Sequence, residues 1–328
     1  MNEVVATANA NVALAKYWGK RDAALNLPYT GSLSITLAGL TTIARASFLG
    51  RLSEDRIILS GHEAVGLEAQ RFRGFLNLVR RIARIEAKAE VAITGNFPVA
   101  AGLASSASTF AALAVAATHA AGLSLSDQEL SLLARCGSGS AARSIHGGYV
   151  EWLAGEATDG SDSFAVQVAP ADYWPLGVVV AVTDEGRKRL GSREAMAQAV
   201  KHSPFFPAWL ESHDADLEAI RQGIRDRDLS QIGQAAEHNC LKMHAVSMAA
   251  RPSIFYWTPA TVAVIRRVVE LRQEGLEAYF TIDAGPQLKV LCLPQQRAAV
   301  AEEIGRVPGV QRVLLSGPGS GAQVVEAA

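Results

Sequence analysis

The most chemically suggestive part of the sequence is a run of small and hydroxyl-bearing residues at positions 98–108. It lies between a predicted strand and a predicted alanine-rich helix. Glycine lets a ligand approach the backbone closely, serine donates hydrogen bonds, and a helix start carries the positive end of its dipole. The segment therefore predicts a phosphate cradle, with tight packing of small residues as the alternative. It is not a Walker A loop, because G-x-x-x-x-G-K-[ST] is absent.

A second glycine- and serine-rich segment, at residues 136–148, contains the basic residue Arg143. Residues 137–142 match the dinucleotide-binding pattern G-x-G-x-x-A, but that pattern follows a strand, whereas residues 130–135 read as the end of a helix. We therefore favour a turn that presents hydroxyl groups and the forked guanidinium of Arg143 to a carboxylate or phosphate.

Asp283 stands at the end of a predicted strand, directly before an Ala-Gly-Pro turn. Its carboxylate could orient or deprotonate a hydroxyl group, or the residue could serve only as a turn former. The histidines are dispersed, and His238 and His244 fall on different faces of a predicted helix, so we assign them no metal. No G-x-S-x-G motif supports a serine hydrolase.

Composition limits the classes of partner. The chain has 328 residues, with 31 basic and 32 acidic side chains and a formal net charge of −1, so nucleic acid and membrane surfaces are not expected partners. No apolar stretch approaches the roughly 20 residues of a membrane-spanning helix. The three scattered cysteines suit neither disulfides nor a metal site, and the N-terminus lacks the signal-peptide pattern. We expect a cytoplasmic protein that holds any polyanion in a local site.

Apolar periodicity predicts the elements that must position these residues. Strands are expected at Val4–Ala8, Leu33–Phe48, Arg56–Leu59, Ala89–Thr94, Gly148–Leu153, Phe164–Val168, Leu176–Val182, Glu277–Asp283, Leu288–Leu293 and Val310–Leu315. Helices are expected at Leu67–Ile85, Ala104–Ala121, Ser126–Arg135, Thr258–Gln273 and Pro294–Ile304, and across Ser192–Val246 with breaks at Pro204, Pro207 and Asp226–Asp228. The arginines of the first helix are interpreted as a solvated face. The chain is long enough for two lobes with a cleft between them, the second built from the βα-rich C-terminal region.

Several segments together resemble one enzyme family. They are Asn11-Val-Ala-Leu-Ala-Lys16-Tyr17-Trp18-Gly-Lys20-Arg21-Asp22, Leu25-Asn-Leu-Pro28, Ser32-Leu-Ser34, Asn96-Phe-Pro, Ala101-Gly-Leu-Ala-Ser-Ser, Gly137-Ser-Gly-Ser with Arg143, Ser192-Arg193-Glu194, Glu237-His-Asn-Cys-Leu-Lys-Met-His244, Ala250-Arg-Pro-Ser-Ile-Phe-Tyr256 and Asp283-Ala-Gly-Pro286. In this order they are similar to the diphosphomevalonate decarboxylases of the GHMP kinase superfamily, from residue 4 to about residue 293. K-Y-W-G-K with D-A-G-P is specific to that branch, whereas G-L-A-S-S is common to the superfamily.

The resemblance implies an α+β protein with the GHMP-kinase fold. An N-terminal ATP-binding domain at residues 1–183 would be a ribosomal-protein-S5-like lobe with a left-handed βαβ phosphate-binding unit. Residues 184–328 would form a ferredoxin-like C-terminal lobe, and the molecule would be a homodimer. Thr30-Gly31 and Ala142 depart from the family pattern beside the implied substrate contacts.

The activity implied is ATP-dependent decarboxylation of 5-diphosphomevalonate to isopentenyl diphosphate, ADP, phosphate and CO2, by way of phosphorylation of the C3 hydroxyl. ATP and Mg2+ are the implied cofactors, with Mg2+ held by ATP phosphates and the Ser106 hydroxyl rather than by a dedicated metal site. A phosphomevalonate decarboxylase, a mevalonate-type kinase that does not decarboxylate and a noncatalytic ligand-binding relative are the alternatives.

The resemblance also implies roles for individual residues. Asp283 would accept or orient the hydroxyl proton, Arg143 would hold the substrate carboxylate, and Lys16 would lie among the reacting groups. The implied ATP-binding residues are Gly102, Leu103, Ala104, Ser105, Ser106 and Ser108, with Ser106 also catalytic. The implied substrate-binding residues are Tyr17, Lys20, Ser138, Ser140, Arg143, Ser192 and Arg193. Trp18 is interpreted as a packing residue.

Overall fold

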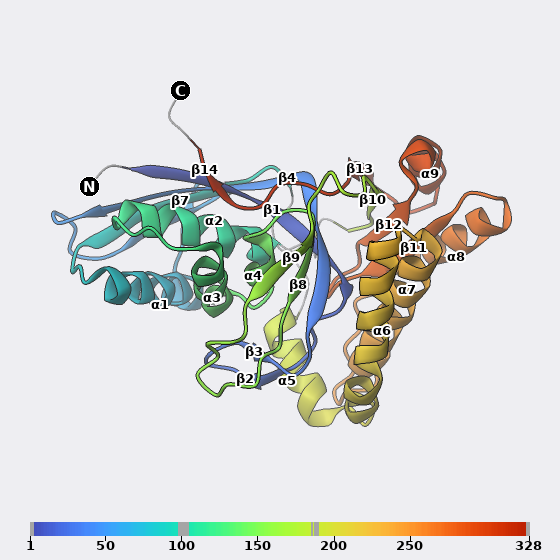
Figure 1. Cartoon of the computed structure of the whole chain (residues 1–328), viewed down its shortest axis with the longest axis horizontal. Coiled ribbons are helices and arrows are strands. Elements are labelled where there is room, and N and C mark those ends of the chain that lie inside the picture. The colour runs from blue at the N-terminus through green and yellow to red at the C-terminus, as the bar shows by residue number, and fades with distance from the viewer. Residues whose placement is uncertain (1–2, 98–104, 185, 187–189, 326–328) are drawn as a thin grey trace.

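Two β-sheets, each covered by helices, form the two lobes of the protein (Figure 1). The computed structural model describes residues 3–97, 105–184, 186 and 190–325. No helix within these ranges has the length and apolar character needed to span a membrane. Because helices and sheets both contribute to each lobe, the fold is a mixed α+β fold, as predicted.

The first sheet has the strand order β14-β1-β4-β7-β5-β6, with β8 and β9 joined to it beside β4. Its strands are β1 (Val4–Ala15), β4 (Ser32–Leu49), β5 (Arg56–Leu59), β6 (His62–Glu63), β7 (Lys88–Gly95), β8 (Tyr149–Trp152), β9 (Ala165–Ala169) and β14 (Gln323–Val324). The helices beneath it in Figure 1 are α1 (Gly66–Ala83), α2 (Ser105–Ala120), α3 (Asp127–Gly137) and α4 (Ala141–Ser144). Helix α2 is almost wholly buried because its alanines let it pack closely on β1 and β4.

The second sheet has the order β11-β12-β10-β13, and all of its pairs are antiparallel. Its strands are β10 (Gly177–Val182), β11 (Ala278–Ile282), β12 (Leu288–Cys292) and β13 (Arg312–Ser316). The remaining helices are α5 (Ser192–His202), α6 (Phe206–Asp226), α7 (Leu229–Met248), α8 (Pro259–Gln273) and α9 (Arg297–Gly305), the last preceded by a 3-10 turn at Pro294–Gln296. A small hairpin, β2 (Lys20–Asp22) with β3 (Leu27–Pro28), lies apart from both sheets.

Strand β10, one of the two inner strands of the second sheet, is apolar at every position. Val179 and Ala181 face the core formed with α8 and α9. Val178, Val180 and Val182 face a different core, which also contains residues of β1, β4, α6 and α7. Since successive side chains of a strand point to opposite faces, a strand buried on both sides needs apolar residues at every position. This second core joins the two lobes.

Most of the predicted elements are confirmed, and so is the capping box that begins α3 at Ser126. Strand β1 is longer than predicted, because Asn9 and Asn11 are accommodated in it by hydrogen bonds to Ser320 and to Ser140 and Ser144. The short helix α4 was not predicted, and Pro207 lies in the first turn of α6 rather than at a break. Proline is tolerated there because the first turn has no intrahelical partner for its missing N–H.

At the level of the lobes, the C-terminal region is βα-rich, as expected. Strands β12 and β13 both pair antiparallel with β10 and therefore run parallel to each other, and α9 connects them, so they form a split βαβ unit. The predicted boundary after residue 183 falls behind β10, although this strand pairs only within the second sheet among the described residues. Strand β14 returns to the first sheet and pairs with β1. Sheet membership therefore favours a boundary between β9 and β10.

The arginines of α1 do not form a solvated face as a group. Arg80 is buried and makes a bidentate ion pair with Asp55, with both N···O distances 2.8 Å. Arg71 lies over the ring of Phe110 and donates to the carbonyl of Gly137. Arg81 is exposed, as expected. The long arginine side chain can reach from an amphipathic helix into buried sites. The position of an arginine in the sequence therefore did not reveal these partners.

Candidate active site

A cavity of about 1040 Å³ lies where β1, the N-terminal end of α2 and the end of β11 meet. The predicted site residues that line it are Lys16, Tyr17, Lys20, Ser105, Ser106, Ser138, Ser140, Arg143, Ser192, Arg193 and Asp283. They come from segments far apart in the sequence, so the fold brings together almost all of the candidates. Gly102, Leu103 and Ala104 lie outside the described residues.

Ser108 is the candidate that the structure places elsewhere. Its side chain is fully buried, shares a 2.7 Å hydrogen bond with Thr42 and donates to the carbonyl of Ser105. It lies inside the packing of α2 rather than on the cavity wall, so the structure does not bring Ser108 to the cavity with the other described candidates. From Ala107 onward α2 is buried on almost all sides, so Ser108 lies in the core although it is only three residues from Ser105.

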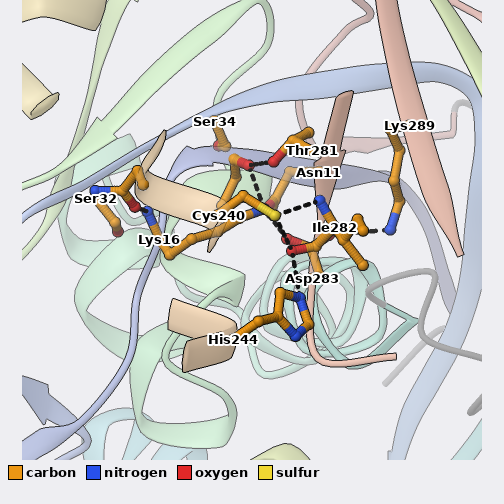
Figure 2. Close-up of polar contacts among 12 residues, drawn as sticks. Asn11, Lys16, Ser32, Ser34, Cys240, His244, Thr281, Ile282, Asp283 and Lys289 are labelled. Carbon is orange, nitrogen blue, oxygen red and sulfur yellow. Dashed lines mark hydrogen bonds and ion pairs between the residues drawn. The ribbon is translucent and has the colours of Figure 1, made fainter. Parts of the chain in front are cut away.

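Asp283 lines the cavity and is paired with two lysines (Figure 2). Its carboxylate oxygens lie 2.9 Å from Nζ of Lys16 and 3.1 Å from Nζ of Lys289. Burial by itself would raise the pKa of Asp283, but the two ammonium groups outweigh it and hold this pKa well below its ordinary range. Lys16 also donates to the carbonyl of Ala13 at 2.7 Å, which fixes its side chain. The aspartate is a charged acceptor, not merely a turn former.

Arg143, which lines the same cavity as Asp283, is held by hydroxyl and amide acceptors. Its Nε donates to Ser34 at 3.0 Å, one terminal nitrogen donates to Ser32, and the other donates to Asn11 at 3.2 Å. Burial lowers the pKa of Arg143 to about 10, so the group remains cationic at neutral pH. Because a guanidinium has five N–H donors, these three contacts leave donors for an anion in the cavity.

A cluster of basic residues, Lys20, Arg71 and Arg193, lines another part of the cavity. Burial, followed by the charges of Arg193 and Arg71, lowers the pKa of Lys20 to about 8. The buried hydroxyl of Tyr17 has no hydrogen-bond partner among the described residues, and burial raises its pKa. Three cations that repel one another beside an unpartnered hydroxyl form a site suited to a multiply charged anion.

The serines connect the two predicted anion-binding segments. Ser106, in the first turn of α2, lies 3.2 Å from the hydroxyl of Ser138 in the turn after α3. A Cβ at Gly139 of this turn would come within 2.8 Å of the Tyr17 ring, so glycine is required for their close approach. The first turn of α2 adds the positive end of the helix dipole. Phosphate oxygens would be accommodated here.

The two departures from the family pattern lie away from this cavity wall. Gly31 contacts α6, where its carbonyl accepts a 2.8 Å hydrogen bond from His213. Ala142 is fully buried beside Val150 and Trp152. Trp18 is buried among apolar residues of α5, α6 and α7, as predicted, and it also borders the cavity.

Sequence reasoning missed the roles of Lys289 and Arg71, and of the α7 residues that contact β11 directly before Asp283. A lysine within the apolar strand Leu288–Cys292 is itself a signal, because an ammonium group is buried only when it is paired. Arg71 gave no such signal, since arginine is common on amphipathic helices. Among the described residues, no cluster of histidine, cysteine and carboxylate side chains could hold a metal ion.

Comparisons with known proteins show the family of the chain. The model for the diphosphomevalonate decarboxylase-like N-terminal domain matches residues 8–165, and the model for the mevalonate 5-diphosphate decarboxylase C-terminal domain matches residues 178–314. The diphosphomevalonate decarboxylase of Candida albicans is 36% identical over 92% of this chain and 89% of its own length. The human enzyme is 36% identical over 93% of this chain and 79% of its own length.

Solved structures extend the similarity to the fold. Mevalonate diphosphate decarboxylase from Staphylococcus aureus has a TM-score of 0.93 and 35% identity, covering 99% of this chain and 98% of that one. A complex described as MDDEF with MVAPP, AMPPCP and magnesium has a TM-score of 0.92 and 37% identity, covering 99% of each chain. With two matching domain models and relatives of this identity over nearly the whole sequence, the chain belongs to the diphosphomevalonate decarboxylase family.

Proposed function

We propose that this chain catalyses the ATP-dependent decarboxylation of 5-diphosphomevalonate to isopentenyl diphosphate, ADP, phosphate and CO2. The observation that carries the proposal is the pairing, in one cavity, of the Lys16–Asp283–Lys289 group with the fixed guanidinium of Arg143. The first can engage a hydroxyl and the second can hold a carboxylate. The substrate carries both groups close together, and its diphosphate would meet the basic cluster.

The chemistry needs the C3 hydroxyl to be phosphorylated, because hydroxide is a very poor leaving group. Asp283 would accept the hydrogen bond of this hydroxyl and orient its oxygen toward the γ-phosphate. Its low pKa makes it a weak base before the reaction, so the proton would move to it only as the new O–P bond forms. Lys16, 2.9 Å from the carboxylate, would stabilise the negative charge that develops there.

Arg143 would hold the substrate carboxylate next to the phosphorylated carbon. The three contacts to Ser32, Ser34 and Asn11 hold the guanidinium still, so little order has to be created when the substrate binds. Departure of the C3 phosphate with its electron pair leaves an electron-deficient carbon. The electrons of the breaking bond to the carboxylate then form the double bond, and CO2 leaves.

The other candidates have roles that their positions support. The substrate diphosphate would contact Tyr17, Lys20, Ser192 and Arg193, with Ser138 and Ser140 nearby. The ATP phosphates would lie at the first turn of α2, where Ser105 and Ser106 line the cavity. Mg2+ would neutralise phosphate charge there, held by ATP and by the Ser106 hydroxyl, which suits the oxygen ligands this ion prefers.

The proposal also includes the fold of each lobe, the oligomeric state and the location in the cell. The sheet topology supports a ribosomal-protein-S5-like first lobe with a left-handed βαβ phosphate-binding unit and a ferredoxin-like second lobe. The parallel pairing of β5 and β7 across α1 and the antiparallel second sheet favour it. A homodimer in the cytoplasm completes the proposal.

The test supplies wild-type protein with Mg2+-ATP and 5-diphosphomevalonate while ADP, free phosphate and CO2 are measured together. Equal amounts of all three products are expected. ADP alone would indicate a kinase, and no product would favour a binding protein. A parallel assay with 5-phosphomevalonate tests the phosphate number, and kcat/KM for the diphosphate should be higher by roughly ten- to a thousandfold. Equal use of both substrates would contradict the assigned diphosphate site.

A further inference from the structure

The segment Glu237–His244 of α7 is one of the family-like segments that the proposed function leaves without a role. Strand β11 is an edge strand of the second sheet and lies against α7. Glu237 accepts the Phe280 N–H at 2.9 Å. Cys240 accepts the Ile282 N–H at 3.2 Å, and its thiol donates to the Ile282 carbonyl. Side chains of α7 thus satisfy backbone groups that a neighbouring strand would otherwise pair.

This contact ends one residue before the catalytic aspartate. Cys240 and His244 both reach Ile282, directly ahead of Asp283 (Figure 2). Both side chains are almost completely buried, and burial lowers the pKa of His244 to about 3, so its imidazole is neutral. The direction in which β11 ends, and with it the Asp283 carboxylate, is therefore fixed by α7.

Asn239, next to Cys240, holds the backbone of Lys16, the lysine that is paired with the Asp283 carboxylate. Oδ1 of Asn239 accepts the backbone N–H of Lys16 at 2.7 Å, and the Asn239 side chain is fully buried. Its amide nitrogen donates to Asp216 of α6 at 2.9 Å. Asp216 is in turn paired with Lys242 at 2.6 Å and with His238 at 2.8 Å. The charged Asp216 therefore fixes which end of the Asn239 amide faces Lys16.

We infer that Asn239 and Cys240 are positioning residues that set the Lys16–Asp283 spacing, with Asp216 orienting Asn239. Two adjacent positions of one rigid helix contact the backbone of Lys16, directly after β1, and of Ile282 in β11. Neither side chain lines the cavity, so neither contacts substrate. The inference rests on the proposed function for its catalytic consequence, whereas the contacts themselves can be measured without it.

The decisive variant is Asn239→Asp, which keeps the shape and the acceptor for Lys16 but places a second carboxylate beside Asp216. The charged and titratable groups around this position are Asp216 and His213 from α6, His238 and Lys242 from α7, and Lys16 directly after β1. At neutral pH the two carboxylates repel and kcat should fall by about ten- to a hundredfold, with KM for ATP unchanged. At acidic pH a shared proton restores the donor, so the ratio of variant to wild-type kcat should rise.

The double variant Asp216→Asn with Asn239→Asp exchanges the two groups and should recover much of the lost kcat. Ser247→Ala is the matched control, since it removes another buried hydrogen bond of α7, to the Met243 carbonyl. A kcat loss that is equal at every pH and is not recovered by the double variant would show a merely structural role and overturn the inference. So would wild-type behaviour of Asn239→Asp.

Amide hydrogen exchange measures the two backbone contacts directly and does not depend on catalysis. Because two different variants are used, the result does not depend on whether any single variant folds. In Asn239→Ala the Lys16 N–H should exchange at least about tenfold faster, and in Cys240→Val the Ile282 N–H should do the same, with β7 unchanged. Unchanged protection of both amides would contradict the inference even if activity fell. If wild type released no CO2, the proposed function would fail while the exchange data still reported whether α7 holds these backbones.

Discussion

At the scale of single residues, the site is defined by charged side chains that are largely shielded from water. Asp283→Asn keeps the side-chain shape but leaves Lys16 and Lys289 facing each other without their shared anion. Turnover should fall by about 10²–10⁴-fold, the usual cost of losing a general base, while an ATP analogue still binds in calorimetry. Near-normal kcat would remove Asp283 from the mechanism.

Lys20 gives a prediction for pH. Burial and the charges of Arg193 and Arg71 lower the pKa of Lys20 to about 8, so the free enzyme loses this cation as pH rises through that value. KM for the diphosphate substrate should therefore increase above about pH 8, by roughly tenfold for one lost charge-assisted bond. In Lys20→Met, KM should be raised at every pH and should not show this increase. The same pH dependence in the variant would assign it to another group.

At the scale of elements, the ion pair between Arg80 and Asp55 attaches α1 to the segment before β5. Both side chains are buried, and Asp55 also accepts the Ala89 N–H at 2.8 Å. Arg80→Met would leave the carboxylate buried with its charge uncompensated, so the free energy of unfolding should fall by about 3–5 kcal/mol. Urea denaturation measures this change. Arg81→Met, one position along the same helix but exposed, should change the free energy of unfolding by less than about 0.5 kcal/mol.

At the scale of the whole molecule, the core that joins the two sheets predicts cooperative unfolding. Leu37 of β4 is 1% exposed and belongs to the same cluster as Val180 of β10. Leu37→Ala should lower the free energy of unfolding by about 2–5 kcal/mol and affect both lobes together. Amide exchange in β7 and in β12 should accelerate in parallel. Loss of protection in β7 alone would show that the lobes unfold independently.

The sequence by itself determined the features that depend on short separations. Apolar periodicity is local, so it predicted most strands and helices, and the capping box at Ser126 needs only four consecutive residues. The motifs that carry Lys16, Arg143 and Asp283 likewise name candidate residues without any knowledge of the fold. Their types and order were sufficient to indicate a phosphate-binding enzyme of this family.

Tertiary structure decided which of these residues meet and what holds them. Lys16 and Asp283 are 267 positions apart, and Asn239 is 223 positions from the backbone N–H that it accepts. Ser108 turned into the core and Arg80 into a buried ion pair because packing determined which face of each helix is covered. The low pKa of Asp283 likewise exists only where Lys16 and Lys289 are brought to it. Contacts across such separations depend on how the sheets and α7 pack, which local periodicity does not encode.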